Sequence, residues 1–206
     1  MPEPTPSRAP AAAPAVPAGG PVHPLDEFYA RAGQALPPLA LVEGEAVPEP
    51  YRRLLVHLDD MTPTLETFHG TPMRLRVMGA CRAGEEYYRE VTLLREDNGR
   101  PVEFGAIKIY LDRFAAAARE EILRERLPLG RILQTQHIAH TSRPAAFFRV
   151  ASDHLINDVL QLTGAQILYG RRNTLYDPAG RPLAEIVEIL PPAGRGERPA
   201  RPGEPR

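Results

Sequence analysis

The sequence predicts a single α+β domain, in which one antiparallel sheet of about six strands packs against helices. Three observations lead to this fold class. Residues from Met73 onward alternate apolar and charged side chains, and an Asn-Gly turn at Asn98 separates two further strand-like segments. Other segments space their apolar residues as amphipathic helices do. With 206 residues, 43% of them hydrophobic, the chain can bury one sizeable core but hardly two.

Both ends of the chain are expected to lie outside this core. Residues 1–24 are dominated by proline and alanine and contain no aromatic side chain, so they cannot bury enough apolar surface to offset the entropy of ordering. Residues 193–206 are rich in glycine, proline and arginine and follow the same logic. We therefore expect a disordered arm over 1–24, the folded domain over 25–192 and a disordered tail over 193–206.

Three helical segments are expected at the start of the folded domain. Residues 25–35 and 51–58 are amphipathic at helical spacing. The third helix begins at Asp60, a residue type that caps helix N-termini, and has Pro63 in its first turn. It should run to Phe68 and end at Gly70.

The strands begin at Met73, where apolar residues alternate with arginines. Segments 87–95 and 102–110 flank Asp97-Asn98-Gly99, and Asn-Gly tolerates the positive φ angles of tight turns, so these strands should pair antiparallel. The remaining elements are a helix over 112–126 that Pro128 ends, a helix over 130–136, a strand over 145–152, a helix over 153–162 capped by Asp153, and strands over 165–176 and 182–190.

The composition argues against several kinds of partner and location. The 25 basic and 26 acidic residues nearly cancel, so we expect neither a nucleic-acid nor a membrane partner. The single cysteine, Cys81, leaves no disulfide framework and no cysteine-based zinc cluster. No apolar run is long enough to cross a bilayer, and no signal-peptide pattern is present. We expect a cytoplasmic protein, and the pattern gives no indication of its oligomeric state.

No motif for a metal, nucleotide or acyl-transfer site is present. His137 and His140 lie three residues apart with no acid pattern to complete a metal site, so we expect both to be structural. The sequence has no glycine-rich phosphate loop, no Gly-x-Ser-x-Gly elbow and no Cys-His arrangement. Any chemistry must depend on arginine, glutamate and backbone groups, and we expect no metal or organic cofactor.

Arg89 is the first candidate site residue. In the strand 87–95 it shares a face with Tyr87, Val91 and Leu93, an apolar setting for a side chain that cannot lose its proton. Such an arginine needs a carboxylate partner, either from the protein or from a ligand. The pattern by itself favours a structural ion pair or an arginine at the sheet edge.

Two acids in the strand 182–190 are further candidates. Glu185 and Glu188 are three residues apart, so they point to opposite faces of a strand that is apolar on both. A buried glutamate has a raised pKa, which suits general acid or base catalysis near neutral pH. An ion-paired glutamate is the commoner outcome at either position, and the pattern does not choose between the two. Residues 128–131 precede a predicted helix and could offer free N–H groups to an anion, although such a segment is most often an ordinary helix start.

In combination, these segments resemble the chorismate lyase family. Asp60-Met61-Thr62 is similar to the Asp-x-Met-Thr segment of that family, Tyr88-Arg89-Glu90-Val91 to its arginine-bearing strand, and Leu127-Pro128-Leu129-Gly130-Arg131 to its Pro-Leu-Gly-Arg turn. The segments 169–172, 180–183 and 187–192 resemble its closing hairpin. The resemblance covers roughly residues 50–192.

This resemblance implies a cofactor-independent lyase that converts chorismate to 4-hydroxybenzoate and pyruvate. Arg89 would bind a substrate carboxylate, Glu188 would be the catalytic acid, and backbone groups at 129–130 would hydrogen-bond the second carboxylate. The match to the Thr-Glu pair of the family selects Glu188 and leaves Glu185 structural. The site residues implied are Arg89 and Glu188 for catalysis, and Arg89, Met61, Leu129 and Gly130 for substrate binding.

Alternatives remain within this family pattern. Glu188 could be a general acid, or the ring hydrogen could pass directly to the enolpyruvyl methylene and leave Glu188 an electrostatic or binding role. The chain departs from the pattern at Val187, in a one-residue shift that a β-bulge could absorb, and over 140–162, where the match is poor. The product could be another hydroxybenzoate, and 4-hydroxybenzoate itself could enter quinone (ubiquinone), pigment or lipid synthesis.

A non-catalytic alternative also follows from the resemblance. The same fold serves as an effector sensor in bacterial transcription regulators, so the domain could bind an aromatic acid without turnover. The proline-rich arm cannot form a helix-turn-helix, and we therefore do not expect a DNA-bound regulator.

Overall fold

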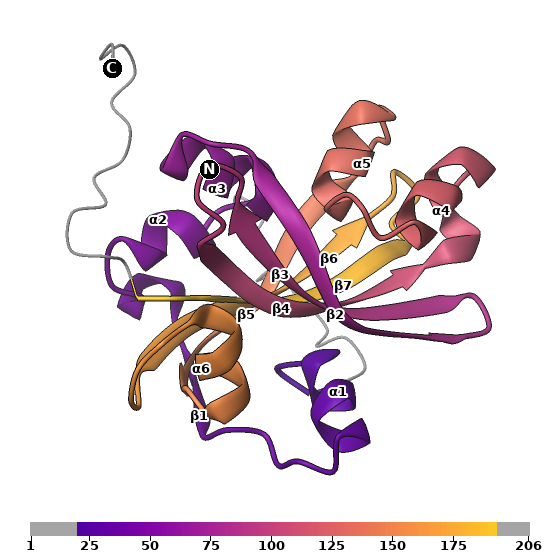
Figure 1. The fold of residues 1–206 in the computed structure, drawn as a ribbon. Helices are drawn as coiled ribbons and strands as arrows, with labels where there is room; N and C mark the ends of the chain where they lie inside the picture. The colour runs from indigo at the N-terminus through magenta and orange to yellow at the C-terminus, as the bar shows by residue number, and fades with distance from the viewer. Residues whose placement is uncertain (1–19, 193–206) are drawn as a thin grey trace, which may run out of the picture.

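One antiparallel sheet of seven strands, in the order β1-β5-β6-β7-β4-β3-β2, organises the chain (Figure 1). The structure is a computed structural model that describes residues 20–192. The strands are β1 (Leu39–Val42), β2 (Met73–Ala83), β3 (Glu86–Arg95), β4 (Pro101–Tyr110), β5 (Thr141–Ala151), β6 (Ile167–Tyr176) and β7 (Pro182–Leu190). The helices are α1 (Leu25–Arg31), α2 (Tyr51–Leu55), α3 (Met61–His69), α4 (Ala116–Leu123), α5 (Leu129–Thr135) and α6 (His154–Leu160). The α+β fold class is confirmed.

The sequence interpretation was wrong in two elements. It missed β1, a four-residue edge strand that pairs with β5 from Leu39↔Val150 to Val42↔Phe147 and is too short to show an alternating pattern. It also made the helix over 112–126 too long. Residues Leu111–Arg113 form a single 3₁₀ turn, and α4 itself ends at Leu123, two residues before the positive φ angle of Glu125.

Local signals account for most of the other boundaries. Gly99 has a φ angle of 70° and closes the β3–β4 hairpin, as the Asn-Gly pair predicts. Asp153 caps α6, because its side chain accepts a hydrogen bond of 2.8 Å from the backbone N–H of Ile156. Asp60 occupies the N-cap position of α3, but its side chain makes no capping hydrogen bond there. The expected cap at Asp60 is therefore wrong, and its carboxylate has another partner, described below.

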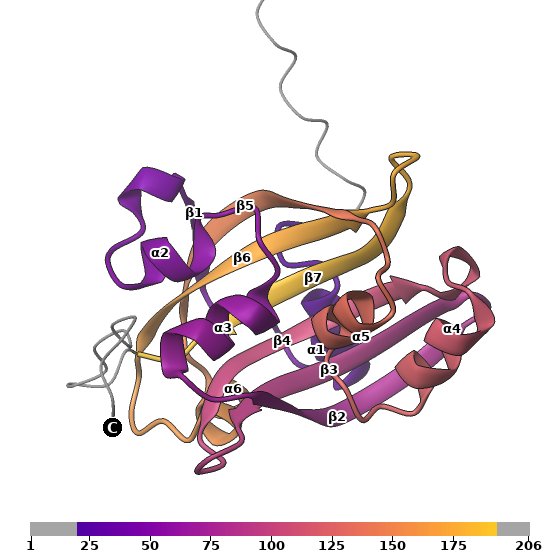
Figure 2. The same ribbon diagram turned by 90° about the horizontal axis from the view of Figure 1, so that it is seen from above.

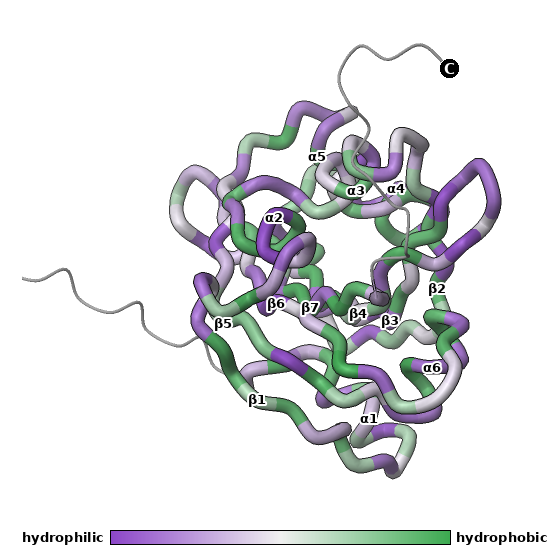
Figure 3. The backbone as a smooth tube through the Cα atoms, turned by 90° about the vertical axis from the view of Figure 1, so that its left-hand side faces the viewer, coloured by the Kyte–Doolittle hydropathy of each residue, from purple (hydrophilic) through white to green (hydrophobic). Residues whose placement is uncertain are grey.

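Helices cover both faces of the sheet. Figures 1 and 2 show α2, α3, α4 and α5 over one face, which we call the upper face, and α1 and α6 under the other, the lower face. The view in Figure 3 shows the same two helical layers on opposite sides of the strands. The lower face is filled by one hydrophobic cluster, in which α1 and α6 pack on residues such as Phe104, Phe148 and Val187.

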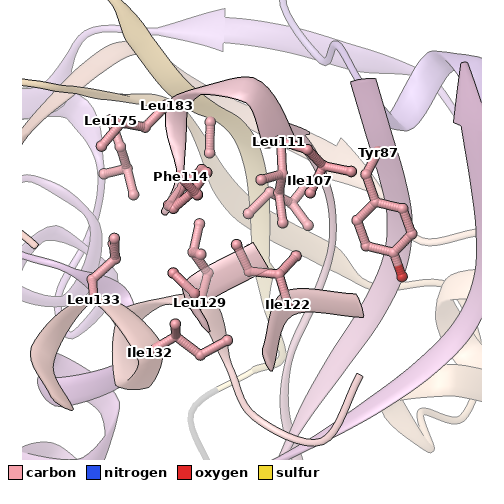
Figure 4. Packing of buried hydrophobic residues seen from close by; sticks show 13 residues of the cluster. Tyr87, Ile107, Leu111, Phe114, Ile122, Leu129, Ile132, Leu133, Leu175 and Leu183 are labelled. Carbon is pink, nitrogen blue, oxygen red and sulfur yellow. The ribbon is translucent and has the colours of Figure 1, made fainter. Parts of the chain in front are cut away.

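The upper face carries two separate hydrophobic clusters. One lies under α4 and α5 and contains Ile107, Ile109, Ile122 and Leu129 (Figure 4). The other lies under α2 and α3 at the far end of the strands, where Leu65 meets Leu93 and Leu190 among its members. The strip of sheet between these two clusters is where the candidate site lies.

The folded region begins before residue 25. Val22 and His23 are buried, with exposed fractions of 3% and 8%, and Arg172 donates a hydrogen bond of 2.9 Å to the carbonyl oxygen of Gly20. The expected disorder of residues 20–24 is therefore wrong, because Val22 packs into the cluster of the lower face. The expected arm over 1–19 and tail over 193–206 lie outside the described residues. Among residues 20–192, no helix combines the length and the apolar character needed to cross a bilayer.

Candidate functional site

A cavity lies on the upper face, between the sheet and the first turns of α3 and α5. Its empty volume is about 530 Å³, part of which is open to solvent. The strand register explains which side chains reach it. Gly105 of β4 pairs with both Val91 and Glu188, and Ile107 pairs with both Arg89 and Ile186, so two rows of residues from three neighbouring strands share this face.

Gly105 pairs with two residues that line the cavity, Val91 and Glu188. A Cβ atom at this position would stand 2.0 Å from the carbonyl oxygen of Val187, a distance at which no side chain fits. The glycine lets β4 and β7 approach closely where Gly105 pairs with Glu188. Gly105 consequently places no side chain between Val91 and Glu188.

Arg89 is a buried cation that forms no ion pair among residues 20–192. Its exposed fraction is 1%, and its Nε and Nη1 atoms have no hydrogen-bond partner among residues 20–192. Burial lowers the pKa of Arg89 to about 10, which leaves the guanidinium protonated at neutral pH. The nearby carboxylate of Glu125 accepts a hydrogen bond from the hydroxyl of Tyr87. The structural ion pair favoured by the pattern is thus not found at Arg89.

Glu188 lies in the same cavity as Arg89 but has a cation of its own. Its exposed fraction is 3%, and its Oε2 atom accepts a hydrogen bond from Nε of the fully buried Arg171 on the adjacent strand β6. Arg171 also donates to the carbonyl oxygens of Leu55, His57 and Asp59 at 3.2 to 3.3 Å. Arg171 therefore links Glu188 on the sheet to the segment between α2 and α3.

Glu103 is a site residue that the sequence interpretation missed. It lies on β4 opposite Leu93, lines the cavity and is 5% exposed, and its Oε2 atom has no hydrogen-bond partner among the described residues. Burial, together with the charge of Glu188, raises the pKa of Glu103 well above its usual range. A signal was present in the sequence. Glu103 stands between Val102 and Phe104 in a strand that is apolar on both faces, which is the argument that made Glu185 and Glu188 candidates.

The other residues implied by the resemblance form the roof of the cavity. Met61 is buried in the first turn of α3, and Leu129 and Gly130 begin α5, so their backbone N–H groups have no acceptor within the helix. The two helices meet here, since a Cβ atom on Gly130 would lie 3.2 Å from the hydroxyl of Thr62. All three implied residues line the cavity together with Arg89 and Glu188.

Glu185 points to the lower face, as the spacing of three residues predicts. Its carboxylate accepts hydrogen bonds from Nη2 of Arg172 at 2.8 Å and from the hydroxyl of Tyr110 at 2.5 Å. The pairing of β6 with β7 shifts by one residue between Leu175 and Tyr176. This irregularity lies between the turn and Glu188, where the resemblance to chorismate lyases requires a one-residue shift.

His140 lies at the edge of the roof. Its Nε2 atom lies 2.9 Å from Oδ2 of Asp60 and its Nδ1 atom 2.8 Å from the carbonyl oxygen of Ile138. This contact engages the Asp60 carboxylate that the sequence analysis assigned to helix capping. Among residues 20–192, no group of three or more histidine, cysteine or acidic side chains is arranged to hold a metal ion.

Comparison with known proteins defines the class of fold. No family model matches the chain, and no curated protein sequence matches it. The chain is similar in structure to PhnF from Mycobacterium smegmatis, with 11% identity over 82% of this chain and 92% of that chain and a TM-score of 0.51. The effector domain of PhnF gives 13% identity over 68% of this chain and 90% of that chain, with a TM-score of 0.50.

A third solved structure is similar over a shorter range. The ligand-binding domain of a putative GntR-family transcriptional regulator from Bordetella bronchiseptica is 14% identical, over 58% of this chain and 86% of that chain, with a TM-score of 0.44. At such identities, the likeness to PhnF and its effector domain establishes the fold alone: one antiparallel sheet with helices on its faces.

Proposed function

We propose that this chain binds a small ring-containing carboxylate in the cavity of the upper face. The observation that carries the proposal is the buried guanidinium of Arg89, which lines the cavity and has two nitrogen atoms without a hydrogen-bond partner in the described part of the chain. A buried arginine without an anion is costly, and a ligand carboxylate would satisfy its planar fork of donors. The cavity therefore has the chemistry of a binding site that a ligand completes.

The walls of the cavity suit an apolar ring. Val91, Ile107 and Ile186 lie on the floor, and Met61 and Leu129 lie in the roof. The free N–H groups at the start of α5 offer a second place for ligand oxygen atoms. Apolar walls with a few fixed polar groups are the usual construction of a small-molecule site.

In its finer form, the proposal is a chorismate lyase, as the sequence resemblance implies. Arg89 and the N–H groups of Leu129 and Gly130 would hold the two carboxylates of chorismate, and the apolar walls would exclude water from the departing enolpyruvyl ether. A general acid must hold a proton, whereas the Glu188 carboxylate forms an ion pair with Arg171. This favours the second of the two routes, in which the ring hydrogen moves directly to the enolpyruvyl methylene and Glu188 stabilises charge.

A non-catalytic ligand-binding domain is the second candidate. It is favoured by the structural likeness to the effector domain of PhnF. Both candidates use the same cavity and the same arginine, so they differ in turnover rather than in where the ligand binds.

A binding experiment tests the shared part of the proposal. We expect 4-hydroxybenzoate to bind in isothermal titration calorimetry, and Arg89→Met to weaken this binding by about 10- to 100-fold, because a charge-assisted contact is worth about 1.5–3 kcal/mol. Arg74→Met is the matched control, since Arg74 is exposed on β2 and should leave affinity unchanged. Equal affinity of wild type and Arg89→Met would contradict the proposal.

A turnover experiment separates the two candidates. Incubation with chorismate should release pyruvate and 4-hydroxybenzoate, with chromatography to tell 4-hydroxybenzoate from another hydroxybenzoate. Arg89→Met should abolish the release, because the substrate carboxylate loses its anchor. Binding of 4-hydroxybenzoate without any release of pyruvate would reject the lyase and leave the ligand-binding domain.

A further inference from the structure

Glu103 has fewer partners than Glu188, the other acid on the cavity floor. Glu188 has Arg171, whereas Glu103 has neither an ion pair nor a hydrogen bond to its buried Oε2 atom among residues 20–192. Arg171 cannot serve both acids equally, because it binds Glu188 through Nε and uses Nη1 and Nη2 for backbone carbonyl oxygens. Glu103 is thus a buried acid that lines the cavity without an ion pair of its own among the described residues.

The two glutamates are close enough to influence each other. Glu188 pairs with Gly105, and Glu103 is two residues from Gly105 on the same face, so the glutamates are diagonal neighbours about 7–8 Å apart at their Cα atoms. Two ionised carboxylates this close repel each other at buried positions, and Arg171 forms an ion pair with only one of them, Glu188. One of the two acids therefore keeps a proton, and Glu103 is the one without an ion pair. The raised pKa of Glu103 agrees with this assignment.

We infer that Glu103 is a ligand-binding group: a neutral carboxylic acid that donates a hydrogen bond to an oxygen atom of the bound ligand. The inference rests on the proposed function, because it takes the ligand to be the one whose carboxylate meets Arg89. A protonated carboxylic acid has one O–H donor, and the oxygen of a hydroxyl or an ether can accept it. The adjacent Glu188 carboxylate can only accept, so it suits the hydrogen of a hydroxyl group.

The strand register sets the separation of the two binding groups. Glu103 pairs with Leu93, and Arg89 is four residues from Leu93 on the same strand, so the Cα atoms of Glu103 and Arg89 lie about 14 Å apart. Both side chains are long and line the same cavity, with Val91 and Ile107 between them. A ring that bridges the two side chains would carry its oxygen groups at opposite positions. The cavity therefore selects ring carboxylates that carry a hydroxyl or ether oxygen opposite the carboxylate.

Binding of paired ligands tests this specificity. Calorimetry would compare 4-hydroxybenzoate with benzoate, which keeps the carboxylate and lacks the oxygen. Wild type should bind 4-hydroxybenzoate about 10-fold more tightly, the effect of one hydrogen bond to a buried acid. Glu103→Leu should abolish this preference and leave benzoate affinity unchanged. Glu103→Gln, whose amide still donates, should retain the preference.

The pH dependence provides a readout that a merely structural residue would not move. The preference of wild type for 4-hydroxybenzoate should fall as pH rises through the pKa of Glu103, because the ionised acid no longer donates. In Glu103→Gln the preference should be independent of pH. Glu90→Gln is the control, since Glu90 alternates to the other face of the sheet and should leave the wild-type pH profile unchanged. Retention of the preference in Glu103→Leu would overturn the inference.

The protonation of Glu103 can be measured without any ligand. The infrared spectrum of wild-type protein near neutral pH should contain a carboxylic acid C=O band that disappears in Glu103→Gln. If that band is absent, the inference fails even where both ligands bind. If neither ligand binds to wild type while the band is present, the proposed binding function fails and the protonated acid remains.

Discussion

The two faces of the sheet differ in how their buried charges are paired, although the same strands supply both faces. Arg171 and Arg172 are neighbours in β6 and point to opposite faces, and each meets a glutamate of β7, Glu188 above and Glu185 below. The upper face adds Arg89, a third arginine with no ion pair among the described residues. A difference in the number of partners therefore separates a structural charge from one that is available to a ligand.

Arg172 and Lys108 on the lower face are cations that have acidic partners. Arg172 is bound by Glu185 and by the carbonyl oxygen of Gly20, and Lys108 lies 2.7 Å from Glu86. Tyrosine hydroxyl groups also donate hydrogen bonds to these carboxylates, as Tyr110 does to Glu185. Buried charges with this many partners hold the fold together but offer little to an incoming molecule.

The largest expected effect is the loss of a paired charge on the lower face. Glu185→Gln leaves the guanidinium of Arg172, which is 1% exposed, without its anion, and should lower the free energy of unfolding by about 3–5 kcal/mol. Urea unfolding followed by circular dichroism measures this change. Arg181→Met is the matched control, because the Arg181–Asp177 pair is at the surface and should contribute less than about 1 kcal/mol. A loss below about 1 kcal/mol in Glu185→Gln would mean that this network is not structural.

Arg89→Met should have the opposite effect on stability. Here the substitution removes a buried charge that has no ion pair within residues 20–192 and supplies an apolar side chain of comparable length. We expect the free energy of unfolding to stay unchanged or to rise by about 1–3 kcal/mol. The same urea experiment measures it, beside the loss of ligand affinity. A fall of more than about 2 kcal/mol would show that Arg89 has a structural partner and would remove the contrast between the two faces.

Much of the fold could be predicted because its signals are local. The Asn-Gly turn, the cap at Asp153 and the alternation from Met73 each depend on a few adjacent residues, and each marks an observed element. The edge strand β1 was missed because its four residues form a strand only through pairing with β5, which is distant in the sequence. The helix over 112–126 was predicted too long because helix propensity does not report where the backbone turns at Glu125.

The candidate site could be predicted only in part. Alternation placed Arg89 on an apolar face, and the family resemblance chose Glu188 over Glu185. Neither argument could say which charges would find partners, because the partners come from other strands. Arg171 on β6 pairs with Glu188 on β7, whereas Nε and Nη1 of Arg89 have no hydrogen-bond partner among residues 20–192. Glu103 was missed for the same reason. Its role depends on Arg171, which already donates a hydrogen bond to the neighbouring Glu188.

The smallest expected effect concerns two histidines of the upper face, whose pKa values are shifted in opposite directions. Both ring nitrogens of His140 face acceptors, the Asp60 carboxylate and the Ile138 carbonyl oxygen, so the contact needs the doubly protonated ring. The hydrogen bond to Asp60 raises the pKa of His140. His57 accepts a hydrogen bond from the backbone N–H of Asp59 through Nδ1, and burial lowers its pKa. Both imidazoles titrate in a pH range in which guanidinium groups remain protonated.

His140→Gln tests this difference. Because the folded pKa of His140 lies above the unfolded value of about 6.5, its contribution is fully present below that pH and is lost as pH rises through the folded pKa. Wild type should exceed His140→Gln in the free energy of unfolding by about 0.5–1 kcal/mol near pH 5.5, and this excess should shrink at higher pH. Measuring the difference between the two proteins cancels the opposite contribution of His57, which both retain. An excess that grows with rising pH would mean that His140 is neutral in the folded protein and that the Asp60 contact is an ordinary hydrogen bond.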